Sequence, residues 1–260
     1  MMLLALNIGN TNITFGGYHP DGKLVFSSRL YADSRLSSDE LVYKMVNMLA
    51  LYGASPLDVT DVILASVVPS LTPRMREALQ KMCQVPLMEV GPGLKSGVRI
   101  RMDNPAQLGG ELLCAVVGAL RRHEPPLLVM NVDTAISLLA VDEAASIVGG
   151  VILPAPQLSL EALVRNTAQL PQVDPETKPR RFLGTNTADC LHSGILNGTA
   201  AMLDGMFAKC RAVLRAPQAP VIVTGTLPAT IRDACDTPMD YRETLILDGL
   251  YAIWKRNGKK

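Results

Sequence analysis

The chain has 260 residues, 48% of them hydrophobic, and a formal net charge of +1. A chain of this length buries one large core or two linked ones. Residues of both charge signs are mixed along it, which excludes the basic stripe of a nucleic-acid-binding protein. No apolar run approaches the ~20 residues of a membrane span. We therefore expect small molecules or proteins as partners, with no contact to nucleic acid or membrane.

The cysteines and the first residues of the chain indicate the cellular compartment in which the protein is expected. The five cysteines are scattered, odd in number and without a CxxC pair, a pattern typical of reduced thiols. The apolar stretch Met1–Ile8 has no basic segment before it and runs straight into a glycine turn, unlike a secretion signal. The sequence predicts a cytoplasmic protein.

The first half of the chain predicts a meander of strands followed by helices. Ser37 and Glu40 have the spacing of a capping box, and apolar residues then recur at helical intervals, so a helix is expected after Ser37. The strands expected from apolar runs between turn residues are Leu3–Ile8, Ile13–Tyr18, Lys23–Leu30, Val62–Val67 and Pro86–Val90. Two more helices are expected, at Leu71–Met82 and Leu108–Leu120.

The second half repeats this order. Leu127–Asn131 and Ala135–Val141 repeat the opening hairpin, and Gly149-Gly150 marks its end. Later elements are expected at Ser159–Asn166 (the start of a helical region), Thr187–Leu214 (a long helix), Pro220–Thr224 (a strand) and Thr244–Arg256 (the final helix). The polar, proline-rich stretch 172–181 predicts a surface loop or lid. A meander followed by helices, occurring twice, predicts a duplicated α/β architecture with lobes at 1–122 and 123–260 and a nucleotide cleft between them.

Both predicted hairpins carry a polar turn, in Asn7–Asn12 and again in Asn131–Ala135. A strand that breaks into Gly, Asn and Thr presents backbone N–H groups and hydroxyls, which hold phosphate oxygens. Each copy has an asparagine where a carboxylate is expected, and a neutral amide does not attract Mg²⁺. The two strand–turn elements therefore indicate phosphate chemistry, whereas the asparagines in place of carboxylates argue against it.

Several phrases in this order and spacing together resemble the type III pantothenate kinase family, over nearly the whole chain. The phrases of the first half are Asn7–Asn12 with Gly16, Ala65–Leu71, Val90–Gly97 and Asp103–Gly109. Those of the second half are Gly149–Pro154, Ser159–Leu163, Thr167–Pro171, Asn186-Thr187 with Ser193-Gly194, Val223–Gly225 and Leu245–Leu250.

The resemblance implies an actin/hexokinase-like (ribonuclease H-like) duplicated fold and ATP-dependent phosphorylation of pantothenate, the first step toward coenzyme A. It also implies Mg²⁺ and a monovalent cation, K⁺ or NH4⁺, and a dimer whose substrate pocket lies near the subunit interface. By position, the residues expected at nucleotide and phosphate are Asn7, Gly9, Asn10, Thr11, Asn12, Thr134 and Gly225. Those expected at the substrate, pantothenate or an analogue, are Gly109, Gly110, Leu112 and Thr187.

The departures from the family fall where it does its chemistry. The family's opening Asp is Asn7 here, and its Gly-Ala-Asp-Arg phrase, which supplies the general base and a cation for the substrate carboxylate, is Gly109–Leu112. Its Asp-x-Gly-Thr phrase, which supplies a monovalent-cation ligand, is Asn131–Thr134. The family's double glycine after the late strand, which lets the chain come close to adenine, is Gly225-Thr226 here.

Each departure has two interpretations. Asn7 either fixes the turn through side-chain hydrogen bonds or ligates metal, the first being favoured. Glu111 is either the catalytic base, displaced by one methylene, or a solvated glutamate at a helix start. Asp133 either compensates as a metal ligand for Asn131 or forms an Asx-turn.

Three further positions complete these interpretations. Leu112 lacks the guanidinium fork that binds a carboxylate and is expected to pack as a helix core residue. Thr134 and Thr187 are either hydroxyl donors to a ligand or caps.

Taken together, the sequence predicts a pantothenate kinase-like protein with impaired activity in the isolated chain. The alternative is a catalytically inactive pseudokinase that serves as a subunit of a heteromeric kinase or as a regulatory binding protein. A homodimer, or a heterodimer with a paralogue, is expected through the segment Thr187–Leu214. Its apolar residues Leu191, Ile195, Leu203, Met206 and Phe207 lie among small ones, Gly194, Gly198 and Ala201, and an internal core helix is the other interpretation.

Overall fold

The computed structural model describes residues 1–258, which its contacts divide into two units. The first unit comprises Met1–Val98, Asp103–Arg122 and the segment from Thr244 onward, and the second comprises Arg99–Met102 and His123–Glu243. The division after residue 122 coincides with the expected lobe boundary. The final helix, however, belongs to the first unit, because it packs against helix α3 of that unit.

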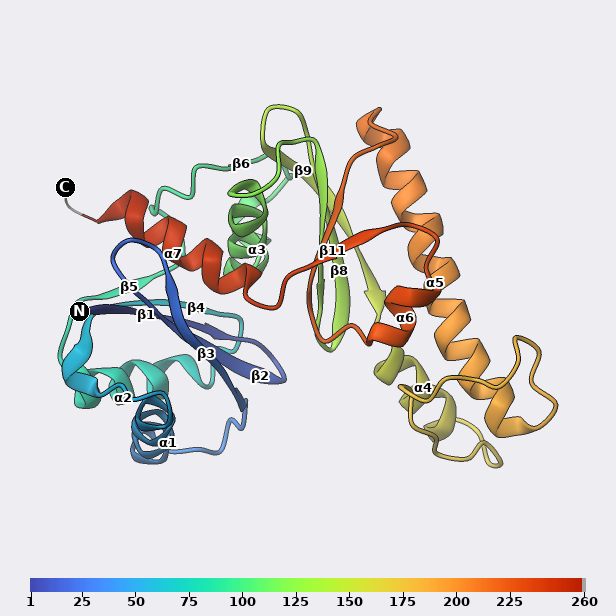
Figure 1. The fold of residues 1–260 in the computed structure, drawn as a ribbon, viewed down its shortest axis with the longest axis horizontal. Helices are drawn as coiled ribbons and strands as arrows, with labels where there is room; N and C mark the ends of the chain where they lie inside the picture. Colours follow the sequence, from blue (N-terminus) through green and yellow to red (C-terminus); the bar gives the residue numbers. More distant parts are fainter. Residues whose placement is uncertain (259–260) are drawn as a thin grey trace. The chain divides into compact units, whose positions relative to one another are not determined.

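The first unit is built on a five-stranded sheet of order β3-β2-β1-β4-β5 (Figure 1). Its strands are β1 (Met2–Ile8), β2 (Asn12–Tyr18), β3 (Leu24–Tyr31), β4 (Val59–Ser66) and β5 (Leu87–Glu89). Its helices are α1 (Ser38–Leu51), α2 (Thr72–Cys83), α3 (Gly110–Leu120) and α7 (Leu245–Asn257), with short 3₁₀ turns at Pro56–Asp58 and Pro105–Gln107.

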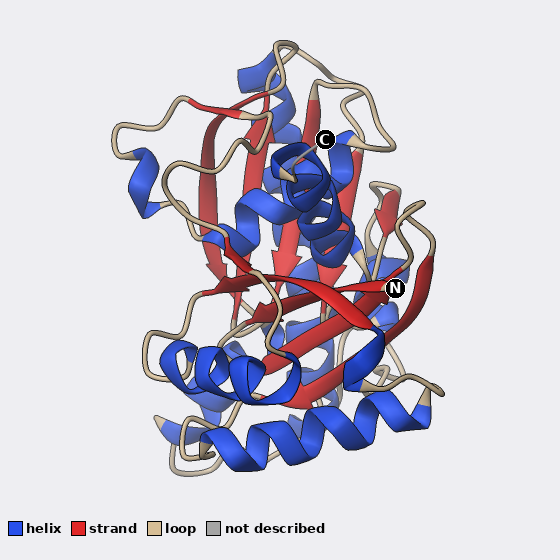
Figure 2. Cartoon of the chain, turned by 90° about the vertical axis from the view of Figure 1, so that its left-hand side faces the viewer, coloured by secondary structure: helices blue, strands red, loops and turns tan. Residues whose placement is uncertain are grey.

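The second unit is built on a six-stranded sheet of order β11-β10-β7-β8-β9-β6, whose strands are drawn in red with those of the first sheet in Figure 2. Its strands are β6 (Arg99–Ile100), β7 (Leu127–Val132), β8 (Ala135–Val141), β9 (Ser146–Pro154), β10 (Val221–Gly225) and β11 (Met239–Tyr241). Its helices are α4 (Pro156–Arg165), α5 (Thr187–Leu214) and α6 (Ala229–Ala234).

The two sheets confirm the predicted duplication. Strand β1 pairs antiparallel with β2 and parallel with β4, and β7 likewise pairs antiparallel with β8 and parallel with β10. The orders β3-β2-β1-β4-β5 and β9-β8-β7-β10-β11 therefore match strand for strand, and β6 is an addition at the edge of the second sheet.

Two details differ from the sequence expectations. Gly149-Gly150 does not end the second hairpin but lies inside β9, where both residues pair with β8. The short elements β6, β11 and α6 were not predicted, since two to six residues carry too little periodicity to be recognised.

The alternation of side chains along β1 sets the position of the site. Leu4, Leu6 and Ile8 pack in the core under α1 and α2, whereas Leu3 and Ala5 pack in a second cluster with residues of α3 and α7. Because side chains alternate between the faces of a strand, Asn7 follows Leu3 and Ala5 on the face covered by α3 and α7.

Helices α3 and α7 cross at very short range. A Cβ atom on Gly118 would lie 2.1 Å from the carbonyl oxygen of Leu245, and one on Gly249 would lie 1.8 Å from that of Cys114. Only glycine leaves room for this crossing, which explains why the end of the chain packs on the first unit.

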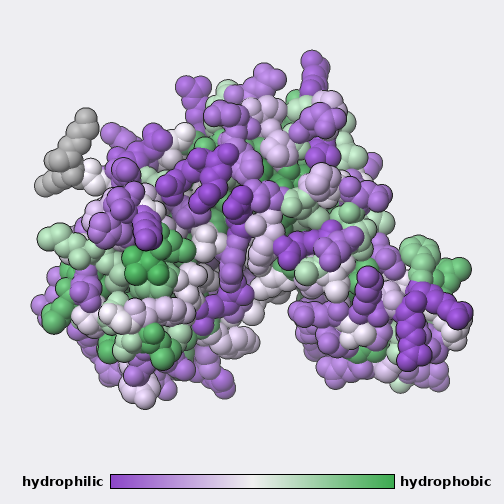
Figure 3. Space-filling model, in the orientation of Figure 1, coloured by the Kyte–Doolittle hydropathy of each residue, from purple (hydrophilic) through white to green (hydrophobic). Residues whose placement is uncertain are grey.

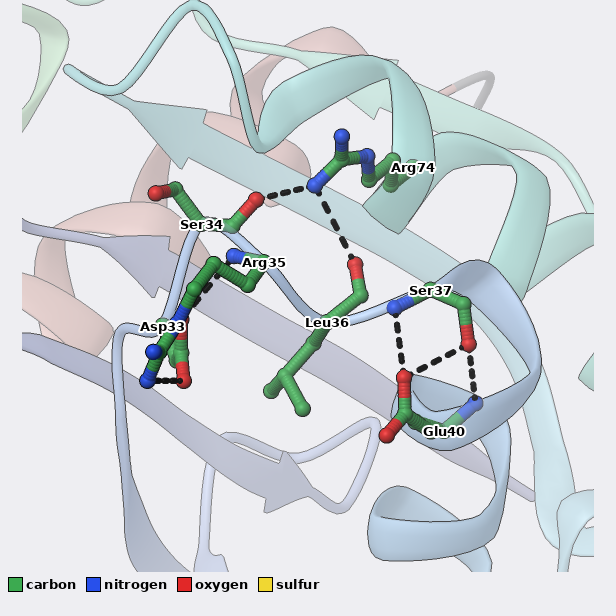
Figure 4. Close-up of polar contacts among 7 residues, drawn as sticks. All are labelled: Asp33, Ser34, Arg35, Leu36, Ser37, Glu40 and Arg74. Atoms are coloured by element: carbon green, nitrogen blue, oxygen red, sulfur yellow. Dashed lines mark hydrogen bonds and ion pairs between the residues drawn. The ribbon is translucent and has the colours of Figure 1, made fainter.

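The predicted capping box at the start of α1 is present (Figure 4). The Glu40 N–H donates to Ser37 Oγ at 3.3 Å, and the Ser37 N–H donates to Glu40 Oε2 at 2.8 Å. The preceding segment is held by Arg74 of α2, whose guanidinium donates to the carbonyl oxygens of Ser34 and Leu36. These bonds fix the connection between the β-meander and the helices. No helix among residues 1–258 is long and apolar enough to cross a membrane.

Candidate active-site elements in the two units

The first polar turn lies at the carboxyl end of β1. Gly9 donates its N–H to the carbonyl oxygen of Asn12 at 2.9 Å, which closes the hairpin through the backbone. Asn7 is 4% exposed, and its Oδ1 atom is buried without a hydrogen-bond partner. The side-chain oxygen of Asn7 therefore does not fix the turn, and any such hydrogen bond would have to come from its amide nitrogen. A buried carbonyl oxygen without a partner leaves an acceptor unsatisfied, at a cost of about 1–3 kcal/mol.

The start of α3 lies at the same edge of the first sheet. Val67, just after β4, donates its N–H to the carbonyl oxygen of Ile8 at 3.0 Å. A Cβ atom on Gly109 would lie 3.3 Å from Val67 Cγ1, and one on Gly110 would lie 3.3 Å from Val90 Cγ1. The structure thus brings Gly109 and Gly110 to the carboxyl ends of the parallel strands, where open α/β sheets bind ligands.

Glu111 is the second residue of α3 and is 7% exposed. The interpretation as a solvated glutamate is wrong, although its place in the first helical turn is as predicted. Burial, and then the Glu111 charge, raise the pKa of the Cys114 thiol on the next turn of α3. Glu111 is therefore a buried side chain in the first turn of α3, and its role as a base stays a prediction.

Leu112 differs from its expected role. It is half-buried and belongs to none of the three apolar clusters formed by the described residues, whereas its neighbour Leu113 packs against the cluster with α7. A partly exposed leucine in the first turn of α3 contributes apolar surface where an arginine would offer a cation.

The second polar turn lies at the carboxyl end of β7 and mirrors the first. Asn131 is 7% exposed and pairs in register with Ser137 of β8 and Thr224 of β10. Asp133 donates its backbone N–H to the carbonyl oxygen of Ala135 at 3.0 Å, and Thr134 is exposed at the tip. Thr134 lies in the turn between strands β7 and β8 and is not at the N-cap position of a helix.

Gly225, at the end of β10, touches that turn. Its φ is +92°, and a Cβ atom there would lie 2.0 Å from the carbonyl oxygen of Val132. Thr226 donates its N–H to the same oxygen at 2.7 Å, and its Oγ1 lies 3.2 Å from it. From the sequence, Thr226 is notable only because it replaces the second glycine of the family's glycine pair. The structure shows that it ties β10 to the end of β7.

Thr187 is the first residue of α5 and is exposed. The N-cap is Asn186, whose Oδ1 accepts the N–H of Asp189 at 2.9 Å, so Thr187 is not the cap either. The first turn of α5 is bonded to the residues before it: Asn186 Nδ2 donates to Asp189 Oδ2 at 2.8 Å, and Cys190 Sγ lies 3.3 Å from the carbonyl oxygen of Gly184.

The residues of α5 proposed as an interface prove to belong to the core. Leu191 and Ile195 are buried, and Leu203 and Phe207 are fully enclosed in the cluster of the second unit, with Met206 against it. Gly194, Gly198 and Ala201 lie on the exposed side. The internal-helix interpretation holds, and the expectation that these apolar residues face a partner is wrong.

The polar groups of the two turns can be compared with the ligands that Mg²⁺ requires. Mg²⁺ is held by one or two carboxylates together with phosphate oxygens, and the buried groups at the strand ends are the neutral amides of Asn7 and Asn131. Among residues 1–258, no three His, Cys, Asp or Glu side chains gather into a metal-binding group. The two buried amides by themselves do not fit direct coordination of Mg²⁺, and the one carboxylate in these two turns is that of Asp133.

The fold is similar to that of known proteins. A solved structure of the activator of 2-hydroxyisocaproyl-CoA dehydratase from Clostridium difficile, with bound ADPNP, superposes with a TM-score of 0.58 at 11% identity, covering 98% of this chain and 94% of that one. The chain therefore has the two-lobed fold of the actin/hexokinase-like kinases and ATPases.

Sequence comparison narrows this class to one family. The family model for type III pantothenate kinase matches residues 3–209. Type III pantothenate kinases from Myxococcus xanthus and Rhodospirillum centenum are 33% and 35% identical over 98% and 100% of this chain, and over 99% and 100% of their own lengths. The chain belongs to the type III pantothenate kinase family.

Proposed function

We propose that the chain binds pantothenate and a nucleotide as its relatives' name implies, and that phosphoryl transfer by the isolated chain is slow. The observation that carries this proposal is the pair of buried asparagines, Asn7 and Asn131, at equivalent ends of the two central strands. Phosphoryl transfer depends on positioning and on neutralising the charge spread over the transferred group. Neutral amides cannot recruit the cations that do this.

The residues that remain support binding. The turn Gly9–Asn12 and the exposed Thr134 offer N–H groups and a hydroxyl to phosphate oxygens. Glu111 is the group proposed to accept the proton of the substrate's primary alcohol. A bound divalent cation would neutralise the phosphates, and under this proposal it would be held by those phosphates rather than by the protein.

Substrate recognition is proposed to be altered as well. Leu112 offers no charge-assisted hydrogen bond to a carboxylate, so pantothenate binds weakly or an analogue without that carboxylate binds in its place. Thr187 is the remaining residue proposed to contact the substrate.

The alternative is a subunit without turnover of its own, either in a heteromeric kinase or as a regulatory binding protein. It is supported by four departures from the family pattern, in a chain that keeps both sheets of the fold: Asn7, Glu111, Leu112 and Asn131. A homodimer, or a heterodimer with a paralogue, and a cytoplasmic location are part of the proposal. Light scattering of the purified chain, alone and co-expressed with a paralogue that carries the carboxylates, tests the assembly.

Calorimetric titration tests the binding part of the proposal. Mg-ATP and pantothenate are titrated separately and then each in the presence of the other. We expect measurable binding of at least one ligand, with weak affinity for Mg-ATP because the carboxylates are missing. The absence of heat from both ligands at millimolar concentration would contradict a retained kinase site.

A further inference from the structure

A pocket of about 280 Å³ lies within the second unit, away from the residues assigned above. It is bounded by the loop before α5, by the middle of α5 and by α6. Its lining includes Lys178, Arg180, Arg181, Phe182, Asn197 and Thr230. Figure 3 shows strongly hydrophilic and hydrophobic side chains next to each other over this loop.

The charge of the lining is unbalanced. Three cations, Lys178, Arg180 and Arg181, face one carboxylate, that of Asp233. Within residues 1–258 none of the three cations has an ion-pair partner, unlike His123 and Arg242 of the same unit, which both pair with Asp240. Like charges held in one lining repel each other, and an anion between them removes that repulsion.

The polar groups of the pocket are arranged for an acceptor-rich ligand. Thr230 Oγ1 is buried and has no hydrogen-bond partner among the described atoms. The loop is tied to α5, because Ser193 Oγ donates to the carbonyl oxygen of Phe182, and Asn197 Nδ2 donates to Ser193 Oγ at 2.9 Å. The cationic segment therefore ends at a fixed point on α5.

We propose that this pocket is a binding site for a phosphate-bearing anion of about diphosphate size. Guanidinium groups bind phosphate oxygens in a bidentate manner, and Thr230, whose hydroxyl has no partner, belongs to the pocket lining. The volume suits a small ligand, and the ring of Phe182, which is 74% exposed, lies beside the pocket and can stack on a nucleobase. The site is separate from the polar turns, so it does not rest on the proposed kinase function.

The test is calorimetric titration of the full chain with pyrophosphate, without metal and at low ionic strength. The double variant Arg180→Gln/Arg181→Gln is expected to weaken binding by about tenfold or more, since two charge-assisted contacts are lost. Thr230→Val is expected to weaken it by roughly threefold to tenfold. The two arginines are exposed, and valine has nearly the same shape as threonine, so both variants should fold. A thermal melt checks that each variant is folded.

Two controls separate this site from the rest of the molecule. Lys209→Gln removes one positive charge on the exposed side of α5, roughly 18 Å along the helix from Asn197, and should leave binding unchanged. Thr134→Ala is titrated beside it: pyrophosphate binding that weakens in Thr134→Ala but not in Arg180→Gln/Arg181→Gln would place the ligand at the hairpin turn and overturn the proposal. Absence of pyrophosphate binding at millimolar concentration, or equal binding by the double variant and the wild-type chain, would overturn the proposal.

A second titration with ADP distinguishes two sources of the phosphates. Tighter binding of ADP than of pyrophosphate, with the difference lost in Phe182→Ala, supports a nucleotide as the ligand. Equal binding of the two supports a free diphosphate. Tighter binding of ADP that survives the Arg180→Gln/Arg181→Gln change would contradict the pocket as its site.

Discussion

Restoring both strand-end carboxylates, by Asn7→Asp together with Asn131→Asp, is expected to increase the affinity for Mg-ATP by about tenfold or more. Both side chains are buried at the carboxyl ends of the central strands, where a carboxylate adds a full negative charge for the cation. Cation affinity changes by orders of magnitude with the number of charged ligands. Calorimetric titration of the double variant against the wild-type chain measures the effect.

The matched control for this experiment is Thr134→Ala in the double variant. Thr134 is exposed at the tip of the second turn, and its hydroxyl is proposed to face the phosphates. Its loss should reduce the affinity that was gained. Identical Mg-ATP binding in the wild-type chain and in Asn7→Asp/Asn131→Asp would argue against the polar turns as a nucleotide site.

Replacing Gly249 by alanine is expected to reduce the free energy of unfolding by about 3 kcal/mol or more, or to prevent folding of the first unit. The new Cβ would lie 1.8 Å from the carbonyl oxygen of Cys114, and neither α7 nor α3 can retreat without breaking their shared packing. The measurement is the midpoint of urea denaturation, or the soluble yield where no folded protein is obtained.

The control is Gly205→Ala on α5. A Cβ atom there meets nothing within 4 Å, and the residue is exposed in a helix interior. This change should increase stability by about 0.5–1 kcal/mol, because alanine loses less conformational freedom than glycine on folding. A Gly249→Ala chain as stable as wild type would show that the α3–α7 crossing is looser than described.

Much of the fold could be predicted because its signals are local. The capping box at Ser37 predicted the start of α1, and the two apolar strands with polar turns predicted the duplicated hairpins. Helix α5 was predicted residue for residue, as Thr187–Leu214. The assignment of the final helix to the second lobe was wrong because the contact that decides it, Gly249 against Cys114, joins residues far apart in the chain.

The candidate site could be predicted only in part for a similar reason. Sequence position identified the two turns and the start of α3. Whether a side chain there is solvated or hydrogen-bonded depends on its burial, which the sequence does not give. The solvated interpretation of Glu111 fails because its side chain is buried, and Asn7 Oδ1 is left without a partner on the face of β1 that α3 and α7 cover. Likewise, the apolar residues of α5 matched an interface pattern equally well until Leu203 and Phe207 were found enclosed.

The most direct measurement for this account is the rate of pantothenate phosphorylation by the purified chain, with saturating Mg-ATP and a monovalent cation. Losing one charge-stabilising group from a preorganised site costs about 10²–10³ in rate, and here more than one is replaced. The account predicts a rate near background for the isolated chain, with an increase in Asn7→Asp/Asn131→Asp. Robust turnover by the unmodified chain, at the level of a relative that carries the carboxylates, would contradict it.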